Sequence, residues 1–135
     1  MPYMEINTSL ELNDEEKHQL CEDIGEFISI VPGKSREITM MNLKAGCYIE
    51  FPGLSNPCPP TVPSINIEFR ILGRSPFRSK KDFVREVTSM LCEKYSFEPW
   101  RVFVNIFECD SWGFRGEYRD IMIIEETHKA TGDLD

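Results

Sequence analysis

Hydrophobic and polar positions follow the same order twice along the chain. In the first half, residues 2–8 alternate between the two kinds, which predicts a strand with Met4 and Ile6 on one face. An apolar stripe at spacings of three and four then predicts a helix, which Pro32-Gly33 ends. The stripe comprises Leu20, Ile24, Phe27, Ile28 and Val31. Residues 37–43 have strand propensity again, so this half predicts a β-α-β unit with parallel strands.

The second half repeats the pattern. Residues 65–71 alternate cleanly and predict a strand, and Ser79 is expected to cap the helix that follows. The buried stripe of this helix is predicted to comprise Phe83, Val84, Val87, Met90, Leu91 and Tyr95. Residues 101–107 return as a strand. Two such units, repeated at about 60 residues, predict an α+β fold, an α/β sandwich whose four-stranded mixed sheet carries two helices on one face.

Shorter signals describe the segments between these elements. Asn13 precedes three acidic residues, with Glu16 at the capping-box position, and predicts the start of the first helix. Residues 47–51 are a candidate short strand, and the proline-rich residues 52–63 are predicted to form a loop. Residues 111–116 are predicted as a turn carrying two aromatic side chains. Residues 120–124 are interpreted as a short extra strand or a partner-docking segment, and the last eight residues are expected to fray.

Length and composition fit one globular domain. The chain has 135 residues, of which 41% are hydrophobic and 28% charged, and it contains no run of about 18 apolar residues that would span a bilayer. Its first twenty residues include several acidic side chains and no basic region followed by an apolar stretch. No secretory signal is therefore predicted, and a cytoplasmic location is expected.

Charge and cysteine content exclude several function classes. A net charge of −8 argues against a nucleic-acid surface. One basic cluster is expected to mark a loop and a helix start rather than a phosphate site; it comprises Arg70, Arg74, Arg78, Lys80 and Lys81. Five cysteines without a C-x-x-C pair, together with two histidines, predict neither a disulfide framework nor a metal site.

Apolar side chains are also expected on the face of the sheet that the two helices leave open. Asn66, Glu68 and Arg70 on that face suit water, but Phe103 and Phe107, with one of two methionines at 40 and 41, must also be accommodated there. This pattern predicts that subunits pack together through the sheet.

Pro2 is the main candidate for chemistry. An initiator methionine followed by a small residue is commonly removed, which would leave Pro2 with a free secondary amine. The unperturbed pKa of an α-amine is about 8, and burial or a nearby cation lowers it toward the range that suits a general base. The alternative is that the Met-Pro start has no chemical meaning. If Met1 is retained, the Pro2 nitrogen is a tertiary amide and cannot act as a base.

Six pieces occur along the chain in this order: Pro2 with Ile6-Asn7-Thr8, Gly33-Lys34, residues 51–58, Ile71-Leu72-Gly73, residues 101–105 and residues 112–116. Together they resemble macrophage migration inhibitory factor (MIF) and its relatives in the tautomerase superfamily. The likeness spans residues 2–118, so residues 1–118 are expected to form a tautomerase-like domain. Residues 119–135 would then be a partly flexible C-terminal extension.

The resemblance implies a homotrimer with active sites at its subunit interfaces, and keto-enol tautomerisation without a metal or cofactor. The implied substrate is phenylpyruvate or a related aromatic α-keto acid, and dopachrome-type activity is also implied. Pro2 would be the base, and Lys34 would bind the substrate carboxylate and lower the pKa of the Pro2 amine. The implied substrate-binding positions are the backbone amide near Leu72, Phe103 and Asn105 from a neighbouring subunit, and Phe114.

The chain departs from the MIF pattern in four places. Phe103 stands where mammalian members have a tyrosine, which removes a hydroxyl near the substrate. Cys58 lacks the second cysteine of the mammalian C-x-x-C motif, so thiol-redox activity is not expected. Residues 59–63 lengthen a loop, and the C-terminal extension runs past the usual end of the family.

Other interpretations remain open from the residues alone. Lys34 also suits a solvated position at a helix C-terminus, Asn105 suits either a pocket or a hydrogen-bonded core position, and Trp112 and Phe114 suit a core or an interface. The rival function is a non-catalytic trimeric binding or signalling protein, with a protein receptor and unconventional secretion left open. A third alternative is an unrelated ferredoxin-like ligand-binding domain. Neither nucleic acid nor a membrane is expected as a partner.

Overall fold

A four-stranded mixed sheet forms the centre of the fold. The computed structural model describes residues 2–51 and 62–121. The sheet has the order β2-β1-β3-β4, with β1 at Tyr3–Thr8, β2 at Met40–Lys44, β3 at Ile65–Leu72 and β4 at Val102–Cys109. Strands β1 and β2 are parallel, β1 and β3 antiparallel, and β3 and β4 parallel. This topology confirms the predicted pair of β-α-β units.

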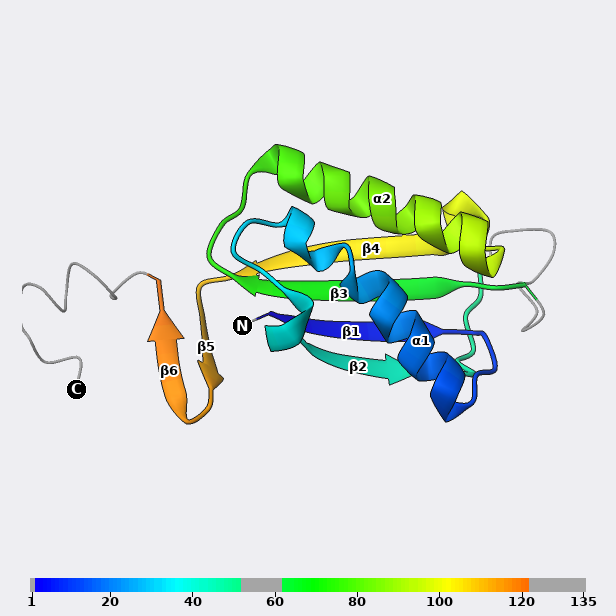
Figure 1. Cartoon of the computed structure of the whole chain (residues 1–135), viewed down its shortest axis with the longest axis horizontal. Helices are drawn as coiled ribbons and strands as arrows, with labels where there is room; N and C mark the ends of the chain where they lie inside the picture. The colour runs from blue at the N-terminus through cyan, green and yellow to red at the C-terminus, as the bar shows by residue number, and fades with distance from the viewer. Residues whose placement is uncertain (1, 52–61, 122–135) are drawn as a thin grey trace, which may run out of the picture.

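Two helices lie across one face of the sheet (Figure 1). Helix α1 spans Asp14–Gly25 and helix α2 spans Phe77–Tyr95. Three short 3-10 turns connect the elements: η1 at Ile28–Ile30, η2 at Arg36–Ile38 and η3 at Pro99–Arg101. Because both helices cover the same side, the opposite side of the sheet is left open, as the sequence predicts.

The core lies between the helices and the sheet. Alternate residues of β1 and β3 point into it and meet the apolar stripes of the helices. The fully buried side chains include Met4, Ile6, Leu20, Ile24, Ile67, Phe69, Ile71, Phe83, Val87 and Leu91. Within it the rings of Phe69 on β3 and Phe83 on α2 lie 4.9 Å apart. Because Met4 and Ile6 of the first unit belong to the same cluster as these residues, the core joins the two units through contacts that are distant in sequence.

The start of α1 agrees with the prediction, but its end does not. The Asn13 side chain accepts a hydrogen bond from the Glu16 backbone N–H at 2.8 Å, and the Glu16 side chain accepts one from the Asn13 N–H at 3.0 Å, which completes the capping box. The α-helix ends at Gly25, and the 3-10 turn η1 follows. The extension of the helix to Val31 was wrong because a 3-10 turn keeps the three-residue spacing of the apolar stripe. Ile28 and Val31 are nevertheless buried, as expected.

Helix α2 begins two residues earlier than Ser79. Pro76 occupies the N-cap position and makes no side-chain capping bond, and Ser79 lies within the first turn. The prediction that Ser79 caps this helix was therefore wrong. Proline before the first turn suits this start, since its fixed φ needs no rearrangement there.

Two strand predictions also need correction. The strand expected at residues 37–43 forms at Met40–Lys44, because η2 occupies residues 36–38. Residues 47–51 form no strand. The expected loop over residues 52–63 lies mostly outside the described residues, and so do Cys58 and residues 122–124 of the predicted docking segment.

The segment predicted as an aromatic turn is a β-hairpin. Strand β5 spans Ser111–Phe114 and pairs antiparallel with β6 at Glu117–Asp120. Arg115 and Gly116 connect them with φ values of 54° and 77°, a left-handed pair that fits a tight two-residue hairpin turn. The hairpin projects beyond the end of the sheet at which the N-terminus lies (Figure 1), and the predicted domain boundary at residue 118 falls within β6.

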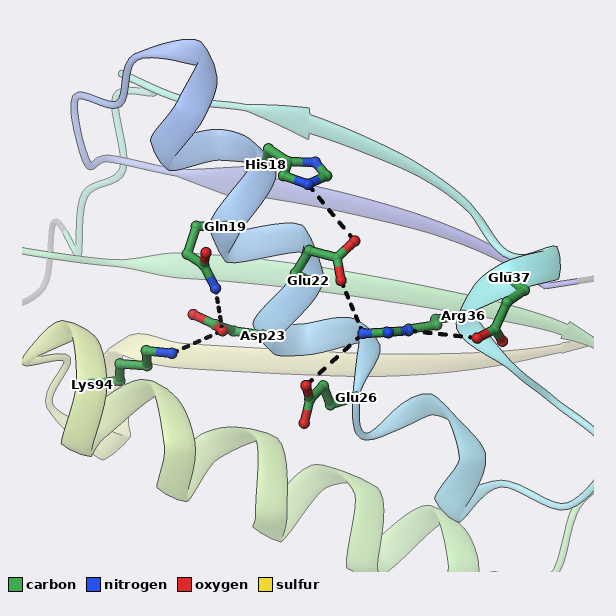
Figure 2. A network of polar contacts seen from close by, with 8 residues as sticks. All are labelled: His18, Gln19, Glu22, Asp23, Glu26, Arg36, Glu37 and Lys94. Carbon is green, nitrogen blue, oxygen red and sulfur yellow. Dashed lines mark hydrogen bonds and ion pairs between the residues drawn. The ribbon is translucent and has the colours of Figure 1, made fainter.

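A polar clamp joins the two helices at Asp23. The carboxylate of Asp23 accepts hydrogen bonds from Tyr95 Oη at 2.5 Å, Lys94 Nζ at 2.9 Å and Gln19 Nε2 at 2.9 Å (Figure 2 shows Asp23, Lys94 and Gln19). Burial opposes ionisation of Asp23, but these hydrogen bonds outweigh it and lower the pKa of the carboxyl group. Burial and the hydrogen bond to Asp23 raise the pKa of Tyr95. At neutral pH the Asp23 carboxyl group is therefore charged, and the Tyr95 hydroxyl group that donates to it is neutral.

Replacing Tyr95 with phenylalanine is expected to lower the free energy of unfolding by about 1–2 kcal/mol, because it removes a hydrogen bond to a charged group. The Asp23 side chain is only 10% exposed, so water replaces the lost donor incompletely. Lys94→Met is the control, since the Lys94 side chain is 53% exposed and such ion pairs contribute about 0–1 kcal/mol. Urea unfolding measures both variants. A Tyr95→Phe variant as stable as the parent would contradict the role of the clamp.

Candidate functional site

The open face of the sheet, opposite the helices, carries three rows of side chains that cross all four strands. From β2 to β4, the first row holds Met40, Tyr3, Arg70 and Phe107, the second holds Asn42, Glu5, Glu68 and Asn105, and the third holds Lys44, Asn7, Asn66 and Phe103. The first row lies at the end of the sheet where β1 begins. Arginine and three apolar or aromatic side chains are therefore placed beside the N-terminus by strand register alone.

A cleft of about 400 Å³ opens at this end of the sheet. We call it the Pro2 cleft. Its sheet side is formed by Pro2, Tyr3, Met40 and Arg70, and its other side by Cys109, Ser111, Trp112, Gly113 and Phe114. The first group lies on or next to the first row of the open face, and the second follows the end of β4 into β5. The hairpin therefore makes one wall of the cleft.

Pro2 is buried in this cleft. Its carbonyl oxygen accepts a hydrogen bond from the Met40 backbone N–H at 3.2 Å, which extends the parallel pairing of β1 and β2 to the first described residue. The backbone at Pro2 is therefore held by the sheet, and Pro2 lines the cleft together with Tyr3, Trp112 and Phe114. A fixed ring in an apolar surrounding is what a proton-transferring amine needs.

Of the cleft residues in the described part of the chain, Arg70 carries the charged side chain. Its guanidinium carbon lies 5.7 Å from the centre of the Tyr3 ring and 5.5 Å from that of the Phe107 ring. Arg70 Nη2 lies 3.0 Å from Glu68 Oε2 and 4.0 Å from Glu5 Oε2. The guanidinium is thus placed between two aromatic rings and oriented by carboxylates of the second row.

The base of the hairpin is fixed to the end of the sheet by several hydrogen bonds. The Gly73 N–H donates to the Cys109 carbonyl at 2.8 Å, and the Ile121 N–H donates to the Asp110 carbonyl at 2.9 Å. Arg74 Nη2 donates to Asp110 Oδ1 at 3.0 Å. These bonds hold the chain on both sides of β5 and β6, so the wall with Trp112 and Phe114 starts from a defined position.

Glu108 fixes the loop between β3 and α2 against the end of β4. Its carboxylate accepts hydrogen bonds from the Ser75 backbone N–H at 2.8 Å and from Lys80 Nζ at 3.0 Å. The Ser75 bond, followed by the Lys80 bond, lowers the pKa of Glu108. The loop held in this way follows Leu72 directly, so Glu108 supports the backbone at which the resemblance places anion binding.

Acidification is expected to remove the stabilisation that Glu108 provides. Because the folded-state pKa is lowered, this stabilisation is complete above the unfolded value of about 4.3 and is lost as the pH falls through the folded value. The melting temperatures of the parent and of Glu108→Gln are therefore expected to differ most near neutral pH and to converge as the pH falls below the folded-state pKa of Glu108. Thermal unfolding followed by circular dichroism measures this. A difference that stays constant with pH would contradict the assignment.

The structure brings two of the six predicted site residues into the Pro2 cleft, namely Pro2 and Phe114. Lys34 is half-buried in the loop after η1, where its backbone N–H donates to the Val31 carbonyl at 3.1 Å. Arg36 ties this loop to α1 through Glu22 at 2.9 Å and Glu26 at 3.9 Å (Figure 2). Lys34 therefore lies in a loop that is fixed to α1, but within a single chain it does not line the Pro2 cleft.

Leu72, Phe103 and Asn105 also lie outside the cleft lining. Leu72 ends β3, and its backbone leads into the loop that Glu108 holds. Phe103 is 63% exposed and occupies the third row of the open face, while Asn105 occupies the second. Phe103 lies four residues along β4 from Phe107 of the first row, and Asn105 lies two residues from it, so neither belongs to the row beside the cleft of its own chain.

Sequence reasoning missed Tyr3, Met40 and Arg70 as members of one site. Arg70 was noted only as a polar residue of the open face and as part of a basic cluster. The signal that would have joined them is the register between β1 and its two neighbours, which pairs Tyr3 with both Met40 and Arg70. Trp112 was predicted only as an aromatic side chain that suits a core or an interface. It was not assigned to the site because the hairpin that positions it was predicted as a turn.

Within residues 2–51 and 62–121, no group of three or more metal-ligating side chains comes together. Over the same residues, no helix has both the length and the hydrophobicity needed to cross a bilayer.

Known proteins match this chain by structure rather than by sequence. Neither a model of a known protein family nor a curated protein sequence matches it. The solved structure of MIF2 from Leishmania major aligns with a TM-score of 0.72 at 17% identity, over 88% of this chain and 97% of that chain. The MIF-like protein of Entamoeba histolytica aligns with a TM-score of 0.69 at 18% identity, over 87% and 98%.

A third match extends the likeness beyond the MIF proteins. A fused 4-OT asymmetric trimer aligns with a TM-score of 0.68 at 15% identity, over 85% of this chain and 94% of that chain. The chain therefore has the fold shared by MIF homologues and 4-OT. The resemblance seen in the sequence is confirmed at the level of the fold.

Proposed function

We propose that the protein is a cofactor-independent keto-enol tautomerase that uses Pro2 as its general base. The observation that supports this most is the position of Pro2, which is buried in a cleft whose walls include Tyr3, Trp112 and Phe114. Removal of Met1 would expose a secondary amine at this point. The cleft disfavours the charged form of that amine by desolvation, and the Arg70 cation disfavours it further.

The proposed reaction moves one proton between carbon and oxygen of an α-keto acid. The neutral Pro2 nitrogen removes a proton from the carbon next to the ketone, and the electron pair of the C–H bond forms the enolate. The resulting prolinium then delivers the proton to the enolate oxygen, which restores the neutral amine. A cation near the ketone oxygen lowers the energy of the enolate-like transition state, and Lys34 is proposed for that role. The aromatic walls favour phenylpyruvate or a related substrate.

Lys34, Leu72, Phe103 and Asn105 complete the proposed site in a homotrimer. Phe103, which is exposed, and Asn105 lie on the open face, where a neighbouring subunit would reach them. Asn66 Oδ1 on the same face is buried with no hydrogen-bond partner among the described residues, and a neighbouring chain would supply one. These observations support the proposal that the working site is shared between chains.

Exchange of the carbon-bound protons of phenylpyruvate in D2O tests this function. The parent protein is expected to accelerate the exchange, and Pro2→Gly is expected to slow it by about tenfold or more, since the replacement amine is no longer held in a ring. Intact mass must show that both samples lack Met1. Equal exchange rates for parent and variant would contradict the proposed tautomerase function. The alternative of a non-catalytic MIF-like binding or signalling protein would then remain.

A further inference from the structure

We propose that Arg70 is the group of the Pro2 cleft that binds a carboxylate, and that it makes the cleft specific for aromatic carboxylate anions. The proposal concerns the site of the proposed function, but it is a statement about binding and does not require turnover. It assigns the substrate carboxylate to Arg70 instead of Lys34, and leaves Lys34 the role at the ketone oxygen.

The charge of the cleft supports this assignment. Arg70 is a lining residue, and the rest of the lining includes no lysine and no carboxylate among residues 2–51 and 62–121. The nearest carboxylates, Glu68 and Glu5, lie in the second row, and Glu5 is also 3.8 Å from Lys44 Nζ. An anion that enters the cleft therefore meets Arg70 without a facing negative group in the lining.

The hydrogen-bond donors of Arg70 are only partly used. Both of its carboxylate contacts involve Nη2, and within the part of the chain that the structure describes no hydrogen bond engages Nη1 or Nε. A guanidinium presents donors in a planar fork that matches a carboxylate. The contact with Glu68 therefore fixes the orientation of the group and leaves donors for a ligand.

Aromatic packing makes Arg70 a preorganised binding group. Its guanidinium lies between the rings of Tyr3 and Phe107 at the distances given above, and these rings are its direct neighbours on the adjacent strands. A side chain held in this way loses little rotamer freedom when a ligand binds. Tyr3, Trp112 and Phe114 meanwhile supply apolar surface for a flat ligand body. Together these features fit an aryl group joined to a carboxylate by a short chain.

Two ligands without a ketone separate this proposal from catalysis. 3-Phenylpropanoate carries the aryl group and the carboxylate, and 3-phenylpropanamide is its uncharged counterpart. Neither can be enolised as an α-keto acid, so their affinities report binding alone. The full-length parent is expected to bind the carboxylate at least about tenfold more tightly than the amide, the difference that a hydrogen bond to a charged group provides.

The two tryptophans of the chain provide a readout with an internal reference. Trp112 lines the cleft, whereas Trp100 lies in η3 next to Arg101, at the other end of β4. In protein labelled with 15N-tryptophan, both ligands are expected to shift the Trp112 indole signal and to leave that of Trp100 in place. A shift confined to Trp100 would overturn the location of the site.

Arg70→Gln is the decisive variant. It is expected to remove the tenfold preference for the carboxylate while the amide affinity stays within about twofold, and Arg70→Lys is expected to retain part of the preference. Arg85→Gln is the matched control, since Arg85 lies on α2 in the other layer and its side chain is 61% exposed; its preference should equal that of the parent. An unchanged Trp100 signal shows that each variant is folded.

Each possible result decides between the proposals. A parent that binds both ligands equally, or an Arg70→Gln variant that keeps the preference, would overturn the assignment, and loss of the preference in Lys34→Gln alone would return the carboxylate to Lys34. If the protein binds the carboxylate more tightly than the amide but does not exchange phenylpyruvate protons, the assignment of Arg70 stands and the proposed tautomerase activity is contradicted. If it exchanges the protons but binds both ligands equally, the tautomerase activity stands and the assignment of Arg70 is contradicted.

Discussion

Insertion of an alanine between Met1 and Pro2 is expected to lower the turnover of phenylpyruvate by about 10²–10⁴-fold, the usual contribution of a positioned general base. After removal of Met1, the inserted alanine remains and acylates the proline nitrogen. The ring stays in the chain, but its nitrogen becomes a tertiary amide without a basic lone pair. The effect therefore isolates the amine from the packing of the ring.

The control for this insertion is ligand binding. Because the insertion leaves Arg70 and the aromatic walls in place, 3-phenylpropanoate is expected to bind within a few-fold of its affinity for the parent. Turnover is followed by the absorbance of the phenylpyruvate enol, and intact mass confirms which N-terminus is present. An inserted variant that is as active as the parent would show that the Pro2 nitrogen is not the base.

Truncation of Phe69 to alanine is expected to lower the free energy of unfolding by about 3–5 kcal/mol. Phe69 is fully buried in β3 and stacks on Phe83 of α2, so the variant leaves a cavity between sheet and helix. Phe77→Ala is the matched control, since Phe77 is 77% exposed and its loss is expected to cost no more than about 0.5 kcal/mol. Guanidinium unfolding of both variants measures the difference. Similar losses at the two positions would contradict the described core.

Local patterns predicted most of the fold. The alternation in residues 65–71 and the capping box at Asn13 each depend on neighbours within a few positions, and the strand and the start of α1 form as predicted. The boundary errors have local causes as well. The 3-10 turn η1 continues the spacing of the α1 stripe, and proline at position 76 starts α2 without a side-chain cap.

The hairpin at residues 111–120 was missed although its signal is present. Trp112 and Phe114 alternate with small residues, and Arg115-Gly116 supplies the left-handed pair that a tight turn needs. The two strands are only four residues each, so the pattern is too short to separate a hairpin from a turn. Its place as a wall of the cleft depends on contacts with Gly73 and the end of β4, which sequence periodicity does not report.

The site could be predicted only in part for the same reason. Pro2 was found from its own chemistry, because an N-terminal secondary amine is unusual wherever it occurs. Arg70 acquires its place from Tyr3 and Phe107, which are distant in sequence and become neighbours only through the strand register. Which residues share a cleft is a property of the pairing between strands, and a single sequence does not specify it.

The direct test of the account is the turnover of phenylpyruvate measured against the fraction of chains that lack Met1. Preparations that differ in methionine removal can be made by varying the aminopeptidase present during expression, and intact mass gives the fraction in each. The account predicts that turnover rises in proportion to this fraction and extrapolates to the uncatalysed rate when every chain keeps Met1. Turnover that does not change with the fraction would contradict the assignment of Pro2 as the base.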